Sequence, residues 1–412
     1  MTDDGGAARA ASRVARESYG KLVAFLASRD RDVAAAEDAL ADAFAAALAV
    51  WPKTGAPENP EGWLVVAARR KLSDAARRRE SAQAAEPTLL RMTEELNEDE
   101  PFPDRRLALM FACAHPGIDE SIRAPLMLQT VLGLDAAAIA SAFLVSPTTM
   151  GQRLSRAKAK IRQACIPFRI PEAELWPERL EAVLEAIYAA FSHGWASAFA
   201  DDAGGRELGE EAIWLGRVVV AASPGDAEAL GLLALMLYAD ARRPARRDAA
   251  GRFAPLAEQD TTRWNAPAID EAEALLKAAS RLRAPGRFQL EAAIQSAHAA
   301  RRLTGKTDWT AISELYGALH ELTGSRVVAV NRAVALANAG DAEAGLAALE
   351  EAGRRGGLET FQADWAAKAD LQARLGDLRA VASYERAIGL ETDPAVRAFL
   401  WERAAAARAR TV

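Results

Sequence analysis

The sequence predicts an all-α protein, and three observations support that prediction. Alanine is abundant, while aromatic residues make up only 6% of the 412-residue chain. Apolar residues recur at helical spacing along most of the chain, as Met150, Leu154 and Ile161 do. Proline and glycine stand at intervals, where they can end helices, and are not spread throughout. We therefore expect helical domains that are separated by short segments rich in helix breakers.

Composition and charge exclude several classes of protein. The formal net charge of -6 argues against a chain coated in nucleic acid, although basic residues concentrate in 69–79 and 153–162. Residues 1–16 lack the apolar core of a secretory signal, and no apolar run approaches the roughly 20 residues of a membrane helix. Two cysteines are too few for a disulfide framework. We expect a cytoplasmic protein without a membrane partner.

Four segments follow one another along the chain. Residues 10–79 carry three helical patterns, and residues 80–104 form an acidic linker that contains prolines. Residues 105–165 hold a second helical domain, which includes a helix-turn-helix. Residues 178–412 are helical, with short breaks between the helices. Two small helical domains followed by a larger helical extension are therefore expected.

The extension carries a weak internal repeat. The pairs Gly340-Asp341 and Gly376-Asp377 each separate two helical patterns, and an alanine follows each pair at the same offset. Their spacing is close to the tetratricopeptide period of about 34 residues. Pro224-Gly225-Asp226 resembles another entrance to a repeat. A tetratricopeptide-like extension is the preferred interpretation, and a generic helical bundle is the alternative.

The stretch from Leu134 to Arg162 is the most informative part of the chain. Ser146 occupies an N-cap position, and Pro147 the first position of a basic helix. This pattern is typical of the second helix of a helix-turn-helix, although an amphipathic hairpin with a solvated charged face has it too. No acidic residue interrupts the basic run, which favours DNA binding. The side chains expected to face DNA are Thr148, Thr149, Gln152, Arg153, Arg156, Lys158, Lys160 and Arg162.

Several stretches together resemble the extracytoplasmic-function sigma factors of bacterial RNA polymerase, in the subgroup with a long tetratricopeptide-like C-terminal extension. Residues 36–44, AEDALADAF, are similar to the region-two helix that docks on the polymerase clamp. Residues 59–79 resemble the promoter-opening part of region two, and residues 134–161 resemble region four. Within the extension, the matching segments are residues 259–265, 285–300, 307–309 and 328–334.

The resemblance implies a sigma factor that directs promoter-specific initiation, with core RNA polymerase and promoter DNA as its partners. Asp38 and Asp42 would face the polymerase, supported by Phe44, whereas the sequence alone favours a solvated acidic face. Region four would contact the upstream promoter element. The extension would regulate the sigma domains, with a regulatory protein as its candidate partner. The residues expected at the minus-ten element are Asn59, Trp63, Arg69, Arg70, Lys71, Arg77 and Arg78.

Two positions depart from the family pattern. Ala41 stands where the family often has a glutamine, which puts one polymerase contact in doubt. Arg70 stands where the family often has an asparagine, which bears on promoter opening. The tryptophans Trp51 and Trp63 bracket a proline-rich loop and would either hold unstacked bases or belong to the core.

Two other classes of protein have the same patterns. One is a helix-turn-helix regulator with a tetratricopeptide-like sensor domain, and the other is a helical protein-binding scaffold. An enzyme is not expected, because no phosphate loop, metal-ligand set or catalytic triad is visible. Cys113 and His115 are better explained by an apolar helix end than by a metal site or a nucleophile. No catalytic residue, metal or cofactor is expected.

Overall fold

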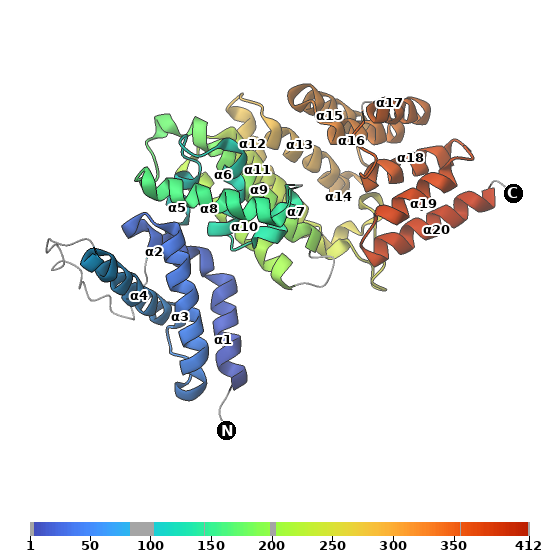
Figure 1. The fold of residues 1–412 in the computed structure, drawn as a ribbon. Helices are drawn as coiled ribbons and strands as arrows, with labels where there is room; N and C mark the ends of the chain where they lie inside the picture. Colours follow the sequence, from blue (N-terminus) through green and yellow to red (C-terminus); the bar gives the residue numbers. More distant parts are fainter. Residues whose placement is uncertain (1–3, 83–102, 144, 198–202, 355, 411–412) are drawn as a thin grey trace. The chain divides into compact units, whose positions relative to one another are not determined.

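The computed structural model describes residues 4–82, 103–143, 145–197, 203–354 and 356–410, and these ranges are helical without a named β-strand. The expected all-α class is therefore confirmed. The chain forms two compact units, Met1–Val218 and Val219–Val412 (Figure 1). No described helix combines the length and the hydropathy that a bilayer span requires.

The N-terminal part of the first unit has four helices among its described residues, one more than expected. The central helix contacts the other three and buries Leu40, Ala43, Ala47 and Trp51. Alanines on its buried face favour close packing, because the distance between helix axes depends on the side chains at the contact. Among the described side chains of the additional first helix, Ala11 and Val14 are buried. The helices are α1 (Asp4–Glu17), α2 (Tyr19–Asp30), α3 (Val33–Thr54) and α4 (Pro60–Ala82).

The remainder of the first unit surrounds an apolar helix, α5, all of whose residues are buried. The rings of Phe111 in α5 and Trp176 lie 4.7 Å apart, and α9 packs against α5 and α6. The boundary expected near residue 178 therefore lies inside this packed unit. Its elements are α5 (Arg106–Cys113), α6 (Glu120–Thr130), α7 (Ala136–Ala142), α8 (Pro147–Gln163), η2 (Ala173–Leu175), α9 (Pro177–Ser197) and most of α10 (Ala203–Ala222).

A buried arginine joins α5 to α10. Arg106 is only 7% exposed, and its guanidinium donates to both carboxylate oxygens of Asp104 at 2.7–3.1 Å. It also pairs with Glu211 and lies 4.0 Å from the ring centroid of Trp214. Burying a charge is costly unless it is paired. The two carboxylates and the indole ring together offset that cost, and they attach α10 to the first unit.

The second unit is a succession of helices in which, from α15 onward, each contacts the next along the chain. This arrangement is typical of stacked helical repeats. Gly340 and Gly376 have positive φ angles of 120° and 71° and follow the ends of α16 and α18, as the repeat pattern predicts. The helices are α11 (Ala227–Ala241), α12 (Ala266–Arg281), α13 (Arg287–Ala299), α14 (Arg301–Thr304), α15 (Trp309–Thr323), α16 (Arg326–Asn338), α17 (Ala342–Arg354), α18 (Gln362–Arg374), α19 (Ala380–Leu390) and α20 (Pro394–Arg410).

The segment between α11 and α12 is irregular. It contains three short 3-10 turns, η4 (Arg243–Ala245), η5 (Leu256–Glu258) and η6 (Thr261–Arg263), and an isolated bridge between Arg247 and Phe253. Its end is anchored by Trp264, which is buried.

We predict that truncation within the first unit abolishes its cooperative folding. A chain that ends at Pro171 lacks α9, whose Val183 and Ile187 are fully buried, and it also lacks Trp176. Losing this buried apolar surface should lower the free energy of unfolding by several kcal/mol, out of the about 5–15 kcal/mol that is usual for a folded protein. Thermal denaturation followed by circular dichroism is the measurement. A matched chain that ends at Ser223, after α10, should unfold cooperatively, and equal stability of the two truncated chains would contradict the prediction.

Candidate nucleic-acid interface

Helices α7 and α8 pack against each other, and α8 begins at the N-cap that the sequence predicts. The carboxylate of Asp135 accepts a hydrogen bond from the Ala138 amide at 2.7 Å, which caps α7. The hydroxyl of Ser146 accepts one from the Thr149 amide at 3.2 Å, and Pro147 occupies the first turn of α8. Capped ends satisfy backbone amides that the helix itself cannot pair. The N-terminus of α8 is thereby fixed.

The packing of α8 separates its apolar face from its polar face. Met150, Leu154 and Ile161 are almost fully buried. The opposite face leaves exposed several of the side chains that were expected to face DNA, while Thr149 is half-buried and its hydroxyl lies 2.8 Å from that of Ser146. These exposed side chains are Thr148, Gln152, Arg153, Arg156, Lys160 and Arg162.

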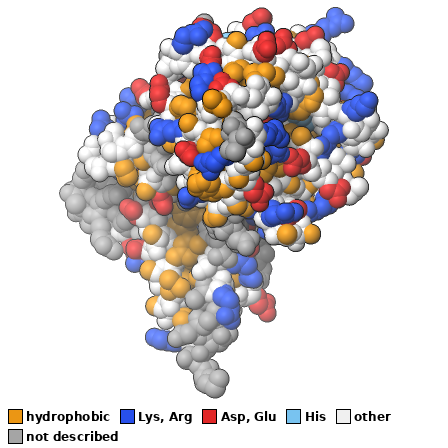
Figure 2. All heavy atoms as spheres, turned by 90° about the vertical axis from the view of Figure 1, so that its right-hand side faces the viewer, with side chains coloured by type: hydrophobic (Ala, Val, Ile, Leu, Met, Phe, Trp, Pro, Cys, Tyr) orange, Lys and Arg blue, Asp and Glu red, His pale blue; other side chains and the backbone are white. Residues whose placement is uncertain are grey.

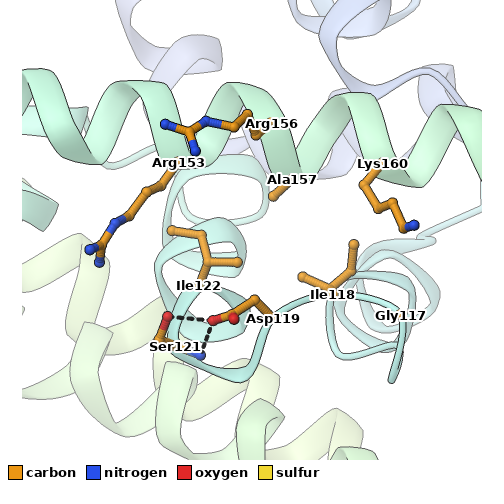
Figure 3. A pocket seen from close by; sticks show the side chains of 9 residues that line it. All are labelled: Gly117, Ile118, Asp119, Ser121, Ile122, Arg153, Arg156, Ala157 and Lys160. Atoms are coloured by element: carbon orange, nitrogen blue, oxygen red, sulfur yellow. Dashed lines mark hydrogen bonds between the residues drawn. The ribbon is translucent and has the colours of Figure 1, made fainter.

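Three of the exposed basic residues border an open groove of about 440 Å³ (Figure 3). Arg153, Arg156 and Lys160 project from α8, and the segment from Gly117 to Ile122 forms the other wall. Asp119 caps α6 in this wall, and hydrogen bonds from the Ser121 hydroxyl and amide lower its pKa. The groove therefore holds three cations and one ionised carboxylate, a balance that favours an anionic ligand such as phosphate.

Lys158 is placed differently from the other basic residues of α8. It is only 9% exposed, and its Nζ lies 2.5 Å from Glu37 Oε2 in α3. Arg162, which is largely exposed, lies 3.2 Å from Asp32 Oδ2, at the start of α3. In this arrangement Lys158 does not face solvent, since its ammonium group is paired inside the unit.

The basic helix α4 presents only part of the surface that the sequence suggests. The guanidinium of Arg69 lies 4.9 Å from the ring centroid of Phe25. Arg70 is exposed, and Lys71 is exposed in an ion pair with Asp42 at 3.4 Å. The side chains of Arg77 and Arg78 lie outside the part of the chain that the structure describes.

The proline-rich loop has a structural role at its end. The side chain of Asn59 accepts a hydrogen bond from the Gly62 amide at 2.9 Å, and Pro60 begins α4, so Asn59 is an N-cap. Trp51 is fully buried, and its ring meets that of Trp63 edge-on at 5.5 Å. Trp63 itself is half-buried.

The residues expected at the polymerase interface lie on two sides of α3, with Asp38 and Asp42 on one side and Phe44 on the other. Asp38 and Asp42 are exposed, and Phe44 is half-buried. Leu48 is 52% exposed. It follows Phe44 by four residues, so it lies on the side of Phe44 and not on that of Asp42.

The segment from Cys113 to His115 shows no features of a reactive site. Cys113 is completely buried, its Sγ lies 3.7 Å from the Thr130 hydroxyl, and burial raises its pKa to about 12. The Gly117 amide donates to Nδ1 of His115 at 3.0 Å. No group of three or more His, Cys, Asp or Glu side chains within the described ranges is arranged to hold a metal ion. A buried thiol with a raised pKa is a poor nucleophile.

Sequence reasoning missed the carboxylates that face α8. Glu37 lies in the first turns of α3, Asp32 lies directly before that helix, and Asp119 lies directly before α6. The only signal for them is local, since Asp32 and Asp119 each stand directly before a helix, as N-cap residues do. Their pairing with a distant basic helix has no local signal.

Comparisons with known proteins give a relative without an assigned activity. The chain is 36% identical over 409 residues to "Uncharacterized protein R00370" of Rhizobium meliloti (strain 1021), a match that covers 97% of this chain and 95% of that protein. Residues 179–280 match the model of a family of unknown function, DUF6596. No solved structure matches.

Capping by Asn59 leads to a prediction that separates a structural role from a role in binding bases. Asn59→Ala should lower the free energy of unfolding by about 1 kcal/mol, because the Gly62 amide loses its acceptor. Asn59→Asp should leave the free energy of unfolding unchanged, since aspartate caps a helix as well as asparagine does and its negative charge interacts favourably with the helix N-terminus. Urea denaturation of both variants is the measurement. If Asn59→Ala were as stable as the unchanged chain, capping by Asn59 would be excluded.

Proposed function

We propose that this chain, which belongs to one family with the uncharacterized protein R00370 of Rhizobium meliloti, is a sigma factor of RNA polymerase. One observation carries the proposal: α8 is a capped helix that packs against α7 and has an exposed polar and basic face, as the second helix of a helix-turn-helix would. In such a helix the N-terminal residues meet base edges in the major groove. No bond is made or broken by the chain, and no cofactor or metal takes part.

The side chains of α8 divide into base readers and phosphate binders. Arg156 can donate two hydrogen bonds to guanine, and Gln152 can pair with adenine. Thr148 lies in the same first turns of the helix. Lys160, nearer the C-terminus of α8, would hold a phosphate and set the register of the helix on DNA.

Region two supplies the second half of the proposed function. Exposed Arg70 and Lys71 on α4 suit the phosphate backbone, and the aromatic ring of half-buried Trp63 suits an unstacked base at the minus-ten element. The acidic surface of α3, made by Asp38 and Asp42, suits a basic surface on core polymerase. A regulator that binds duplex DNA without polymerase accounts for α8 but needs no such surface.

The extension is proposed to regulate the sigma domains and to bind protein. Basic and acidic side chains are interspersed on the face drawn in Figure 2, with no sustained basic stripe. Nucleic-acid binding needs such a stripe, whereas stacked helices provide a surface for a protein partner. We place the whole activity in the cytoplasm, where polymerase and promoter DNA are found.

Reconstitution with core polymerase tests the proposal directly. The purified chain should confer initiation at a subset of promoters selected from genomic DNA. Binding to duplex DNA without any binding to core polymerase would favour the regulator, and binding to neither would favour the protein-binding scaffold.

Substitutions on α8 should separate specificity from affinity. Arg156→Ala should cost about 1–3 kcal/mol at one base position of the upstream element. Lys160→Ala should weaken binding equally across sequences. It should also reduce the slope of log affinity against log salt concentration by about 1, which corresponds to the loss of one phosphate contact. Binding to a promoter library at several salt concentrations is the measurement. Arg169→Ala, which removes an exposed arginine outside α8, is the matched control. If Arg156→Ala left the choice of promoters unchanged, Arg156 would be excluded as a residue that reads a base.

Charge reversal on α3 should weaken docking to polymerase. Asp38→Lys with Asp42→Lys places positive charge opposite a basic partner, and we expect the affinity for core polymerase to fall at least about tenfold. Both carboxylates are exposed, and the ion pair of Asp42 with Lys71 is worth at most about 1 kcal/mol, so the fold should persist. Pull-down with core polymerase is the measurement. Glu58→Lys, in the neighbouring loop, is the control, and equal capture of all three chains would refute the assignment.

A further inference from the structure

A groove runs beside α18 in the second unit and shares no residue with the proposed DNA and polymerase surfaces. Its volume is about 860 Å³, and its walls are the end of α17, the turn before α18 and one side of α19. Both α17 and α19 pack against α18, whereas within the described residues they hardly touch each other (Figure 1). The groove is the space that this packing leaves between α17 and α19, with α18 as its floor.

The groove lies between two successive helix pairs and not inside one pair. The pairs α16–α17 and α18–α19 each turn at a Gly-Asp step, at Gly340-Asp341 and at Gly376-Asp377. Helices α17 and α19 are thus the second helices of their pairs. The surface between them is therefore distinct from any surface that the first helices form.

The floor of the groove is polar although it is buried. Asp364, Lys368 and Gln372 follow one another at intervals of one turn on α18, and all three line the groove. Asp364 is 1% exposed and Gln372 is 5% exposed. Buried polar groups are costly unless they are paired, so each of them is expected to have a partner.

The protein itself satisfies this floor only in part. Oδ2 of Asp364 accepts a hydrogen bond from Lys368 Nζ at 2.5 Å, while Oδ1 is buried and has no partner among the described residues. Oε1 of Gln372 accepts the Ser383 hydroxyl at 2.7 Å, and no acceptor for its amide nitrogen lies in the same part of the chain. An ammonium and an amide group have several donors each. The floor therefore offers donors, and one acceptor, to a ligand.

The rim of the groove adds positive charge. Arg386, on α19, is exposed and donates to the Glu359 carbonyl at 3.3 Å. Unlike Arg379, which pairs with Asp377, it meets no carboxylate within the described ranges. The carboxylate of Glu359 instead accepts the Gly357 amide. An anionic group in the groove would therefore be attracted to Arg386.

We propose that this groove binds an extended peptide with an acidic side chain, which a partner protein supplies. The inference rests on the proposed function, in which the extension binds protein, and it names the site and the chemistry of the partner. Main-chain carbonyls of the peptide accept from Gln372 and Lys368, and one of its amides donates to Asp364. The acidic side chain pairs with Arg386.

The spacing along α18 favours an extended chain over other ligands. Asp364 and Gln372 are eight residues apart, which is about 12 Å along a helix. An extended peptide covers that length with about four residues, and each non-proline residue offers one donor and one acceptor. A helix has already paired these groups within itself, and a small anion reaches only one end of the row. Trp365, which also lines the groove, gives a flat apolar surface for a side chain of the peptide.

Selection from a random heptapeptide phage library by the full-length chain tests the groove without DNA or polymerase. The enriched peptides should contain aspartate or glutamate, and a fluorescein-labelled copy of the most enriched one is then titrated and followed by anisotropy. Ala382→Trp, at an exposed position of α19 that lines the groove, should fill it and weaken binding at least about tenfold. Ala398→Trp, at an exposed position of α20 outside the groove, is the matched control.

Two further variants test the chemistry of the site. Arg386→Ala should weaken binding about tenfold, because a charge-assisted hydrogen bond is lost, and the difference should shrink at high salt. Arg397→Ala, an exposed arginine of α20, is its control. Gln372→Leu combined with Ser383→Ala removes a donor of the floor together with the hydroxyl that pairs with it, so the fold keeps no unpaired partner. This double variant should lose binding while its thermal unfolding stays cooperative.

The outcomes separate the groove from the proposed function. Enrichment of no peptide, enrichment of peptides without acidic residues, or equal binding by Ala382→Trp and Ala398→Trp would each overturn the proposal. Selective loss of binding in Ala382→Trp, Arg386→Ala and the double variant supports it. Since polymerase is absent from these measurements, peptide binding by a chain that fails to confer initiation would refute the sigma-factor function alone. Initiation by a chain whose groove binds no peptide would refute the groove alone.

Discussion

The burial of one face of α8 is the constraint on which the first unit depends. This helix contacts α3, α6 and α7 at once, and its buried residues Met150, Leu154 and Ile161 each contribute about 1.5–3 kcal/mol. Their spacing fixes the rotation of the helix about its axis. Every polar side chain on the other face is then oriented by that rotation, so the packing of the core determines which residues are presented outward.

The positive charge of α8 can be neutralised in two ways. The helix has five basic residues from Arg153 to Arg162 and no acidic residue, so it attracts any nearby anion. Inside the unit the anions are the carboxylates of α3, and outside it they would be phosphates. The groove beside Asp119 and the ion pair of Lys158 with Glu37 thus use the same property of one helix. A surface suited to DNA is for that reason also suited to internal pairing.

The first unit also includes helix α9 and most of α10, which the sequence analysis assigned to the C-terminal extension. Helix α9 covers α5 and α6, and Arg106 attaches α10 through Glu211 and Trp214. The DUF6596 match, residues 179–280, begins within α9 and continues into the second unit. The region of unknown function is therefore partly core of the first unit. A mutation in it can act through stability as well as through a partner.

The sequence by itself determined the all-α class, most of the helices and the cap at Ser146. Asp135 and Asp226 cap α7 and α11 in the same way, because capping and apolar periodicity involve neighbours within about one helical turn. The capping role of Asn59 before Pro60 had the same kind of local signal, and it was passed over for a base contact.

Only the tertiary structure decided which distant groups meet. Glu37 pairs with Lys158, Gly20 meets Val131, and α9 covers α5, although no local pattern links these positions. The helix α1 was missed, and among its side chains that the structure describes only Ala11 and Val14 are buried. Such contacts depend on how whole helices pack after the chain has closed long loops, and the choice among possible partners is made by shape and burial. Periodicity along a single helix contains no information about that choice.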